Sequence, residues 1–230
     1  MKVVINQSNY LPWKGYFDLI HDADLFIFHD DLQYTKNDWR NRNKIKTARG
    51  AEWLTIPTGT REDRLICEVE LPADDWARRH WRKLGESYRH APYFSRYAPF
   101  FEKIYLKQNW RTLSDLNQAV IRAIAVDLLG IKTRFSDSRD YGLKQRKQDR
   151  VLELLAAVGA KTYLSGPAAR DYLEPARFAA AGIELAWKDY SGYPEYPQPH
   201  PPFMHAVSII DLLFSVGEAA PDYIWGWRGA

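Results

Sequence analysis

Short apolar runs alternate with amphipathic stretches at the beginning of the chain. Residues 3–6 and 25–29 are rich in β-branched and aromatic side chains, which predicts two strands. Between them, apolar residues recur at helical spacing from Trp13 to Ile20. Because a strand-helix-strand unit favours parallel pairing, the turns after the two strands are expected side by side at the carboxyl edge of a sheet.

The same alternation returns in the second half of the chain. Its pattern predicts strands at 132–135, 161–164 and 183–187, and helices over 148–158, 175–181 and 208–216. Two further strands are expected at 52–58 and 65–71, while residues 35–50 have little periodicity and indicate an ordered loop or short helix. We see no internal repeat.

The centre of the chain, from about residue 74 to 130, has a helical pattern throughout. Trp76, His80, Leu84 and Tyr88 follow one another at a spacing of four, which places them on one helix face. We therefore predict an α/β fold with an open, mainly parallel sheet, flanking helices and a central helical block. Residues 1–230 would form a single domain, with a helical subdomain at about 74–130.

Composition narrows the possible functions. A formal net charge of +3 permits an anionic ligand without demanding nucleic acid. The single cysteine, Cys67, rules out a disulfide within the chain and a cysteine zinc site, and His200 and His205 lack a third ligand at metal spacing, so we expect no metal site. No apolar run approaches the ~20 residues of a membrane-spanning helix, and no signal-peptide region precedes the first strand, so we expect a cytoplasmic protein without a membrane partner.

Several long motifs together carry a resemblance to a known family. The stretches VVINQSNYLPWKGYF, ADLFIFHDDLQYTKNDWRNRNKIK, LTIPT, APYF, TYLSGPAARDYL and SIIDLLF resemble the WbqC-like protein family nearly from end to end. This chain has Gln7-Ser8 where the family usually has Gln-Pro, so it lacks the rigidity that proline would give the turn.

The resemblance implies work in bacterial surface-polysaccharide precursor biosynthesis, as for O-antigen and capsule. It implies an amide-forming transfer of a glycine-derived acyl group to a nucleotide-linked amino sugar, by an acyl or aminoacyl transferase or an ATP-dependent ligase. ATP with Mg²⁺ and an aminoacyl-tRNA remain open as ways to activate the acyl group. The alternatives are a non-catalytic protein that binds a glycan precursor or a partner, and a nucleotide-binding transferase for another small intermediate. The sugar, the donor and the oligomeric state stay open.

The turn after the first strand carries candidate binding groups. Gln7, Asn9 and Tyr10 offer amide and phenol groups that donate and accept hydrogen bonds, which suits a neutral polar ligand. Trp13 offers a stacking face, although its position is more typical of a core residue. A polar turn at this place in an open sheet favours a ligand site.

Two residues are candidates for removing a proton from the attacking amine. Asp30 ends the second strand and is a candidate general base, with a solvated turn residue as the alternative. His80 lies on an apolar helix face, where a satisfied core histidine is the alternative. Gln33 and Tyr34 follow Asp30 and are expected to face the first turn as substrate-binding residues.

Cations and amides are interleaved after the second strand. Arg42 is expected to bind a diphosphate or carboxylate, since guanidinium groups bind such anions with two parallel hydrogen bonds. A solvated charged surface is the alternative. The substrate-binding residues expected in this segment are Trp39, Asn41, Arg42 and Asn43.

A second turn, after the predicted strand at 161–164, resembles a ligand-binding turn. Ser165 and Gly166 expose backbone N–H groups there and allow close approach of a phosphate or sugar, with an ordinary helix cap as the alternative. Lys144, Arg146 and Gln148 lie just upstream in the sequence and are expected to reach the same edge of the sheet.

Overall fold

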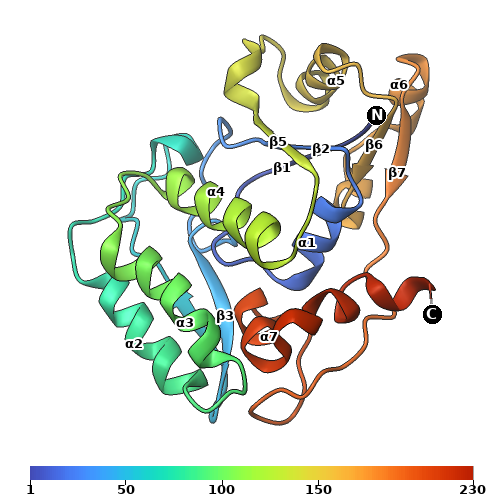
Figure 1. Cartoon of the computed structure of the whole chain (residues 1–230). Coiled ribbons are helices and arrows are strands. Elements are labelled where there is room, and N and C mark those ends of the chain that lie inside the picture. Colours follow the sequence, from blue (N-terminus) through green and yellow to red (C-terminus); the bar gives the residue numbers. More distant parts are fainter. Residues whose placement is uncertain (230) are drawn as a thin grey trace.

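The computed structural model describes residues 1–229 of the chain, and a parallel sheet lies at its centre (Figure 1). Five strands pair in the order β5-β2-β1-β6-β7, and every pairing is parallel. The predicted α/β class with an open parallel sheet is therefore confirmed. The strands are β1 (Lys2–Asn6), β2 (Leu25–Phe28), β5 (Arg134–Asp137), β6 (Thr162–Ser165) and β7 (Glu184–Trp187).

Side chains alternate between the two faces of this sheet, and each face has its own core. Val4 and Phe26 belong to the larger core, together with α1 (Lys14–His21) and the central helices. Ile5 and Ile27 belong to the smaller core. That core includes α5 (Lys147–Ala157) and α6 (Pro175–Ala180), so helices cover both faces, as buried parallel strands require.

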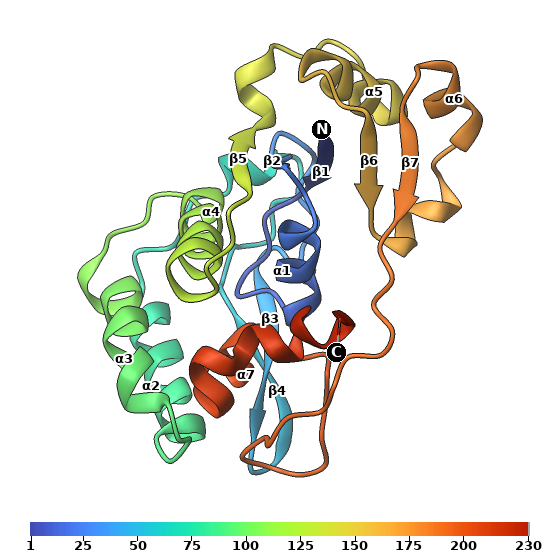
Figure 2. The same ribbon diagram turned by 45° about the vertical axis from the view of Figure 1, so that its right-hand side comes forward.

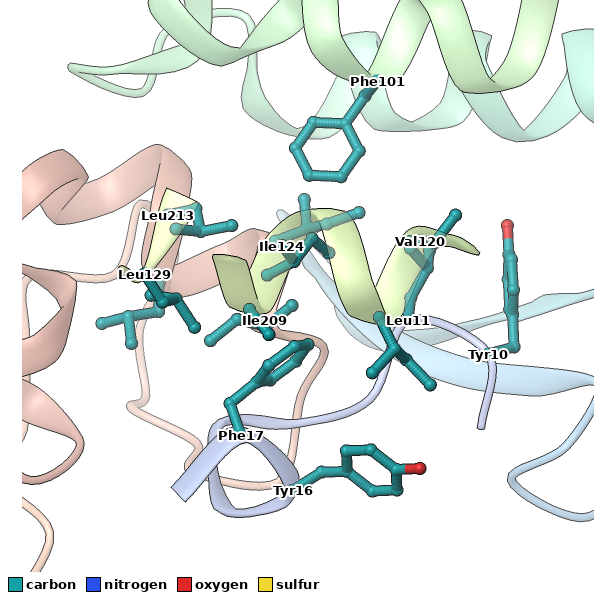
Figure 3. Close-up of a cluster of buried hydrophobic side chains, with 14 of the residues drawn as sticks. Tyr10, Leu11, Tyr16, Phe17, Phe101, Val120, Ile124, Leu129, Ile209 and Leu213 are labelled. Atoms are coloured by element: carbon teal, nitrogen blue, oxygen red, sulfur yellow. The ribbon is translucent and has the colours of Figure 1, made fainter. Parts of the chain in front are cut away.

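The helical block packs against the face of the sheet that carries α1. It comprises α2 (Trp76–Tyr88), α3 (Phe94–Glu102) and α4 (Leu113–Ala123), with α7 (Ile209–Val216) from the end of the chain beside them (Figures 1 and 2). Figure 3 shows Phe101 of α3 on one side of α4, and Leu11 and Phe17 on the other. The segment before α1 therefore packs against α4, a helix from the middle of the sequence.

A β-hairpin lies apart from the main sheet. β3 (Arg42–Thr47) pairs antiparallel with β4 (Gly50–Thr55), and Lys44 lies opposite Trp53. The expectation of a loop or short helix at 35–50 is therefore wrong. Buried Asn43 and Lys46 interrupt the apolar alternation by which such a strand is recognised.

The strand expected at 65–71 is also wrong. Residues Ile66–Glu68 form a short 3₁₀ helix, which lets Ile66 and Val69 both enter the core. Only single bridges flank it, from Gln33 to Leu65 and from Glu70 to Thr112. The other predicted strands and helices coincide with observed ones to within a few residues.

The order of the strands creates a crevice at one edge of the sheet. The chain leaves β1 toward α1 on one face, and α5 and α6 flank β6 on the other face. The carboxyl ends of β1 and β6 therefore meet at a topological switch point, where open α/β sheets bind ligands. Among residues 1–229, no helix has the length and apolar character needed to cross a membrane.

Candidate functional site

The turn that follows β1 is tied to its neighbours by hydrogen bonds on both sides. The Ser8 N–H donates to Oδ1 of Asp30 over 2.8 Å, which ties the turn to the end of β2. The Tyr16 hydroxyl, on α1, donates to the Gln7 carbonyl over 2.8 Å. The turn therefore has a defined position at the carboxyl edge of the sheet.

A cavity of about 970 Å³ opens at this edge, and we call it the sheet-edge cavity. Ile5 and Asn6 of β1 and Gln7 of the following turn line it, together with Tyr163 of β6. The rest of the wall comes from the residues just after β2, from residues between 144 and 151, and from the segment that begins at Tyr172. It is therefore the cavity of the switch point, and its volume lies in the range of small-molecule sites.

Three exposed cations line this cavity where α5 begins. Within residues 1–229, no carboxylate oxygen lies within 4.0 Å of the side-chain nitrogens of Lys144, Arg146 or Lys147. The N–H groups in the first turn of α5 add partial positive charge. Lys147 also has a φ of 52°, a left-handed conformation that is rare outside glycine and collects at functional sites. This part of the cavity suits phosphate or carboxylate.

His29 lies deeper in the cavity and is 5% exposed. Burial lowers its pKa, and the nearby Arg150 lowers it further against the opposing effect of Asp31, so the imidazole is neutral. Nε of Arg150 donates to Nε2 of His29 over 3.1 Å, and Arg150 also pairs with Asp31. Because Nε2 accepts, Nδ1 carries the proton, and His29 can offer a ligand a hydrogen bond but no free basic nitrogen.

Two further side chains complete the wall opposite the strands. Tyr172 is 70% exposed, so its ring offers an open stacking face. The side-chain amide of Gln148 holds the backbone of Glu174 from both sides, accepting from its N–H at 3.0 Å and donating to its carbonyl at 3.4 Å. Of the two acidic residues in the lining, Asp149 pairs with Arg177 and Glu174 has no ionic partner within residues 1–229.

Asp30, which the sequence suggests as a general base, does not line the sheet-edge cavity. It is fully buried, and its carboxylate accepts hydrogen bonds from the Ser8 N–H, from Oγ of Ser114 at 2.5 Å and from Nε2 of Gln118 at 3.0 Å. Asp31 is bound to Arg150 and Ser138. With their oxygens engaged in this way, the two carboxylates do not form a site for Mg²⁺.

His80, the other suggested base, lies in a different cavity beside the β3–β4 hairpin. Its Nδ1 is 2.8 Å from the Tyr10 hydroxyl, which in turn is 2.5 Å from the Tyr105 hydroxyl, and its Nε2 is 3.2 Å from the Thr55 carbonyl. Burial lowers the pKa of His80 to about 4. Tyr10 and His80 thus join the first turn to α2 and to the residues after α3, away from the switch point.

Four of the predicted binding residues meet in a second, smaller cavity of about 290 Å³, which we call the aromatic cavity. Trp13 and Trp39 line it together with Asn9, Asn43, Pro12 and Ala206. It shares no lining residue with the sheet-edge cavity. The turn after β1 therefore contributes Gln7 to one cavity and its later residues to the other.

The remaining predicted binding residues line neither cavity. Gln33 is exposed, and the buried Tyr34 is bonded through its hydroxyl to Oγ1 of Thr58 at 2.8 Å. Nδ2 of the buried Asn41 donates to the Ile56 carbonyl at 2.9 Å, and the Arg42 guanidinium lies 4.2 Å from the Trp53 ring centroid. Two others, Ser165 and Gly166, lie at the end of β6 outside both linings.

A cluster of charged groups in and just after the C-terminal half of α1 has the spacing of metal ligands, but lysine and arginine side chains occupy it. Asp18, His21 and Asp22 bring their ligand atoms within 4.8 Å of one another. Nζ of Lys188 lies 2.8 Å from Asp18 and 2.5 Å from Asp22, and Arg228 pairs with both acids. We therefore infer that this cluster has a structural role, since its ion pairs connect α1 to residues near the end of the chain.

Sequence reasoning found part of the sheet-edge cavity. Lys144, Arg146 and Gln148 were expected at this edge, and all three line it. Tyr172 and Glu174 were missed. Tyr172 lies in the motif TYLSGPAARDYL but was not expected to bind a ligand, and both residues reach the cavity through the position of β6 beside β1.

Comparison with known proteins finds similarity along nearly the whole chain. The model of the WbqC-like protein family matches residues 7–223. An uncharacterized protein of Mycobacterium tuberculosis is 46% identical over 225 residues, which cover 97% of this chain and 97% of that protein. No solved structure matches the chain.

Proposed function

The chain belongs to the WbqC-like protein family, which is linked to polysaccharide-related biosynthesis, and from this premise we propose that it is a transferase for a nucleotide-linked amino sugar. The substrate's diphosphate would bind in the sheet-edge cavity, and its amine would receive a glycine-derived acyl group as an amide. The observation that carries this proposal is the meeting of three cations, unpaired within residues 1–229, with the first turn of α5 at the switch point.

The lining of the cavity supports a division of roles. Lys144, Arg146 and Lys147 would hold the diphosphate, and the exposed ring of Tyr172 would stack on the base or sugar. The Nδ1–H of His29 would donate to the acyl carbonyl oxygen, where negative charge develops during attack.

Glu174 is the residue we assign to proton removal, in place of Asp30 and His80. The amine nitrogen forms a bond to the acyl carbon, the bond from that carbon to its activating phosphate or ester oxygen breaks, and the amine proton passes to the Glu174 carboxylate. Glu174 suits this step because its backbone is fixed by Gln148 and its carboxylate has no ionic partner within residues 1–229.

Binding is tested first, by titration calorimetry with nucleotide-linked amino sugars. Arg146→Ala is expected to weaken binding about 10-fold, the loss of one charge-assisted hydrogen bond of about 1.4 kcal/mol. Arg61→Ala is the matched control, because Arg61 is 68% exposed, pairs with Asp63 and lies outside the cavity. Equal affinities of the two variants for the nucleotide-linked sugar would refute diphosphate binding in the sheet-edge cavity.

The reaction is tested by mass spectrometry of sugars incubated with the protein, glycine, ATP and Mg²⁺, and in a second series with glycyl-tRNA as donor. The proposal requires a glycyl mass gain on one sugar in one series. Glu174→Gln is expected to slow turnover by about 100-fold or more with substrate affinity retained. Tight binding without turnover in either series would make the protein a non-catalytic precursor-binding protein.

A further inference from the structure

The aromatic cavity has walls that are fixed before any ligand arrives. The Trp13 ring packs edge-to-face on Tyr190 at 5.1 Å and on Tyr193 at 6.0 Å between centroids. It also covers Gly15, where an added Cβ would come within 2.2 Å of the indole. Trp13 therefore keeps one orientation because aromatic rings and a glycine leave it this space.

The facing wall, Trp39, is held although it is 43% exposed. Its ring lies 5.6 Å from that of Trp53 at an angle of 44°. Trp53 is in turn covered by the Arg42 guanidinium at 4.2 Å. A large exposed ring that is supported from behind presents a stacking face at low cost in side-chain entropy.

The backbone between these walls is strained and held by hydrogen bonds. Leu11 has a φ of 44°, which is rare for a residue other than glycine. Nδ2 of Asn43 donates to the Leu11 carbonyl at 2.8 Å, the Tyr10 N–H donates to the Trp39 carbonyl at 2.9 Å, and Pro12 accepts from Ile209 at 2.9 Å. Strain that neighbouring groups hold in place is typical of preorganised binding sites.

The two side-chain amides that line the cavity differ in their free hydrogen-bonding capacity. The amide of Asn43 is used within the protein, because it donates to the Tyr10 and Leu11 carbonyls and accepts from the Lys44 N–H. The side-chain amide of Asn9 has no hydrogen-bond partner within residues 1–229, so both its donor and its acceptor are free. Among residues 1–229, no charged side chain lines the cavity.

We propose that the aromatic cavity is a second binding site, which takes an uncharged ring with an apolar face and hydrogen-bonding groups on its edge. The ring face would pack on Trp13 and Trp39, and the edge would meet the amide of Asn9. A sugar ring and a nucleobase share this chemistry, and both fit a volume near the lower end of small-molecule sites. The proposal goes beyond the assigned transfer, because it needs no phosphate and no part of the sheet-edge cavity.

The test uses the full-length protein and probes that carry no phosphate. Binding of N-acetylglucosamine, uridine and adenosine is measured separately by saturation-transfer NMR and by titration. At least one probe is expected to bind wild type, and Trp39→Ala is expected to lower its affinity about 10-fold, in line with one lost stacking contact. Binding of the sugar alone would identify a sugar subsite, and binding of a nucleoside alone a base subsite.

Two variants keep this test separate from the proposed transferase function. Asn9→Ala should weaken the same probe by about 5-fold, the loss of about one neutral hydrogen bond. Arg61→Ala, at an exposed residue that lines neither cavity, should leave probe binding unchanged. Absence of binding by all three probes at millimolar concentration, or equal affinity in wild type and Trp39→Ala, would overturn the proposal.

Discussion

Replacing Asp30 by alanine should destabilise the fold rather than remove a catalytic group. The carboxylate is fully buried and accepts three hydrogen bonds, from the Ser8 N–H, from Ser114 and from Gln118. These donors belong to the turn after β1 and to α4, while Asp30 itself follows β2. One side chain thus joins three elements that are distant in sequence.

The size of the effect follows from what each donor can do after the substitution. The Ser8 N–H would be left buried without a partner, at a cost of about 1–3 kcal/mol. The two side-chain donors each lose a bond to a charged group, but the Ser114 hydroxyl can turn and Gln118 keeps its 2.8 Å bond to Asp137, so we count about 1 kcal/mol for each. The sum is a loss of about 3–5 kcal/mol in the free energy of unfolding.

Urea unfolding followed by tryptophan fluorescence measures this loss directly. With a slope of about 2–3 kcal/mol per molar, the midpoint should fall by about 1–2 M. Asp63→Ala is the control, since the Asp63 side chain is 80% exposed and should change stability by less than about 0.5 kcal/mol. If Asp30→Ala were as stable as wild type and still lost activity, the structural assignment would be refuted in favour of a general base.

Three other substitutions test the surroundings of the two cavities. Gly15→Ala should push the Trp13 ring out of its place, abolish ring binding in the aromatic cavity and lower the melting temperature, because displacing a packed ring costs more than the roughly 1 kcal/mol that alanine gains over glycine in a helix. The pKa of His80 is lowered to about 4 from its ordinary 6.5, so the unfolded chain binds more protons between these values. Stability should fall as pH falls through this window, and His80→Gln should lack that component in pH-dependent urea unfolding. Burial lowers the pKa of Lys14 to about 8 from 10.5. Between these pH values the unfolded chain binds more protons, so the free energy of unfolding should rise with pH in wild type relative to Lys14→Met. Parallel pH curves of the two proteins would contradict the lowered pKa of Lys14.

The hydrophobic pattern predicted helices and strands correctly wherever the apolar residues at helix or strand spacing are also the buried ones. The four residues at a spacing of four in α2 are all buried, as their pattern requires. β3 was missed because Asn43 and Lys46 are buried through partners outside the hairpin, namely carbonyls of the first turn and of Pro202. When a polar residue is buried by partners distant in sequence, the hydrophobic pattern of its own segment does not reveal its burial.

The sequence predicted the segments of the candidate site but not which of them lie together. The turn after β1 and the basic segment before α5 were both recognised, but not that they line one cavity. That juxtaposition depends on β6 pairing with β1, a choice among strand orders that local pattern does not make. His29 illustrates the limit, because its neutral state and its proton position follow from Arg150, which is 121 residues away.

Ser8 stands where the resemblance implies a proline, and it makes a hydrogen bond that positions the first turn. Proline has no N–H, so a chain with proline here would leave Oδ1 of Asp30 without the bond that Ser8 supplies at 2.8 Å. Serine keeps this bond, although its own Oγ is buried without a partner within residues 1–229. In this chain the position of the turn therefore depends on hydrogen bonds more than on backbone rigidity. Since the same turn contributes to both cavities, the Ser8–Asp30 contact sets where Gln7 and Asn9 can meet their ligands.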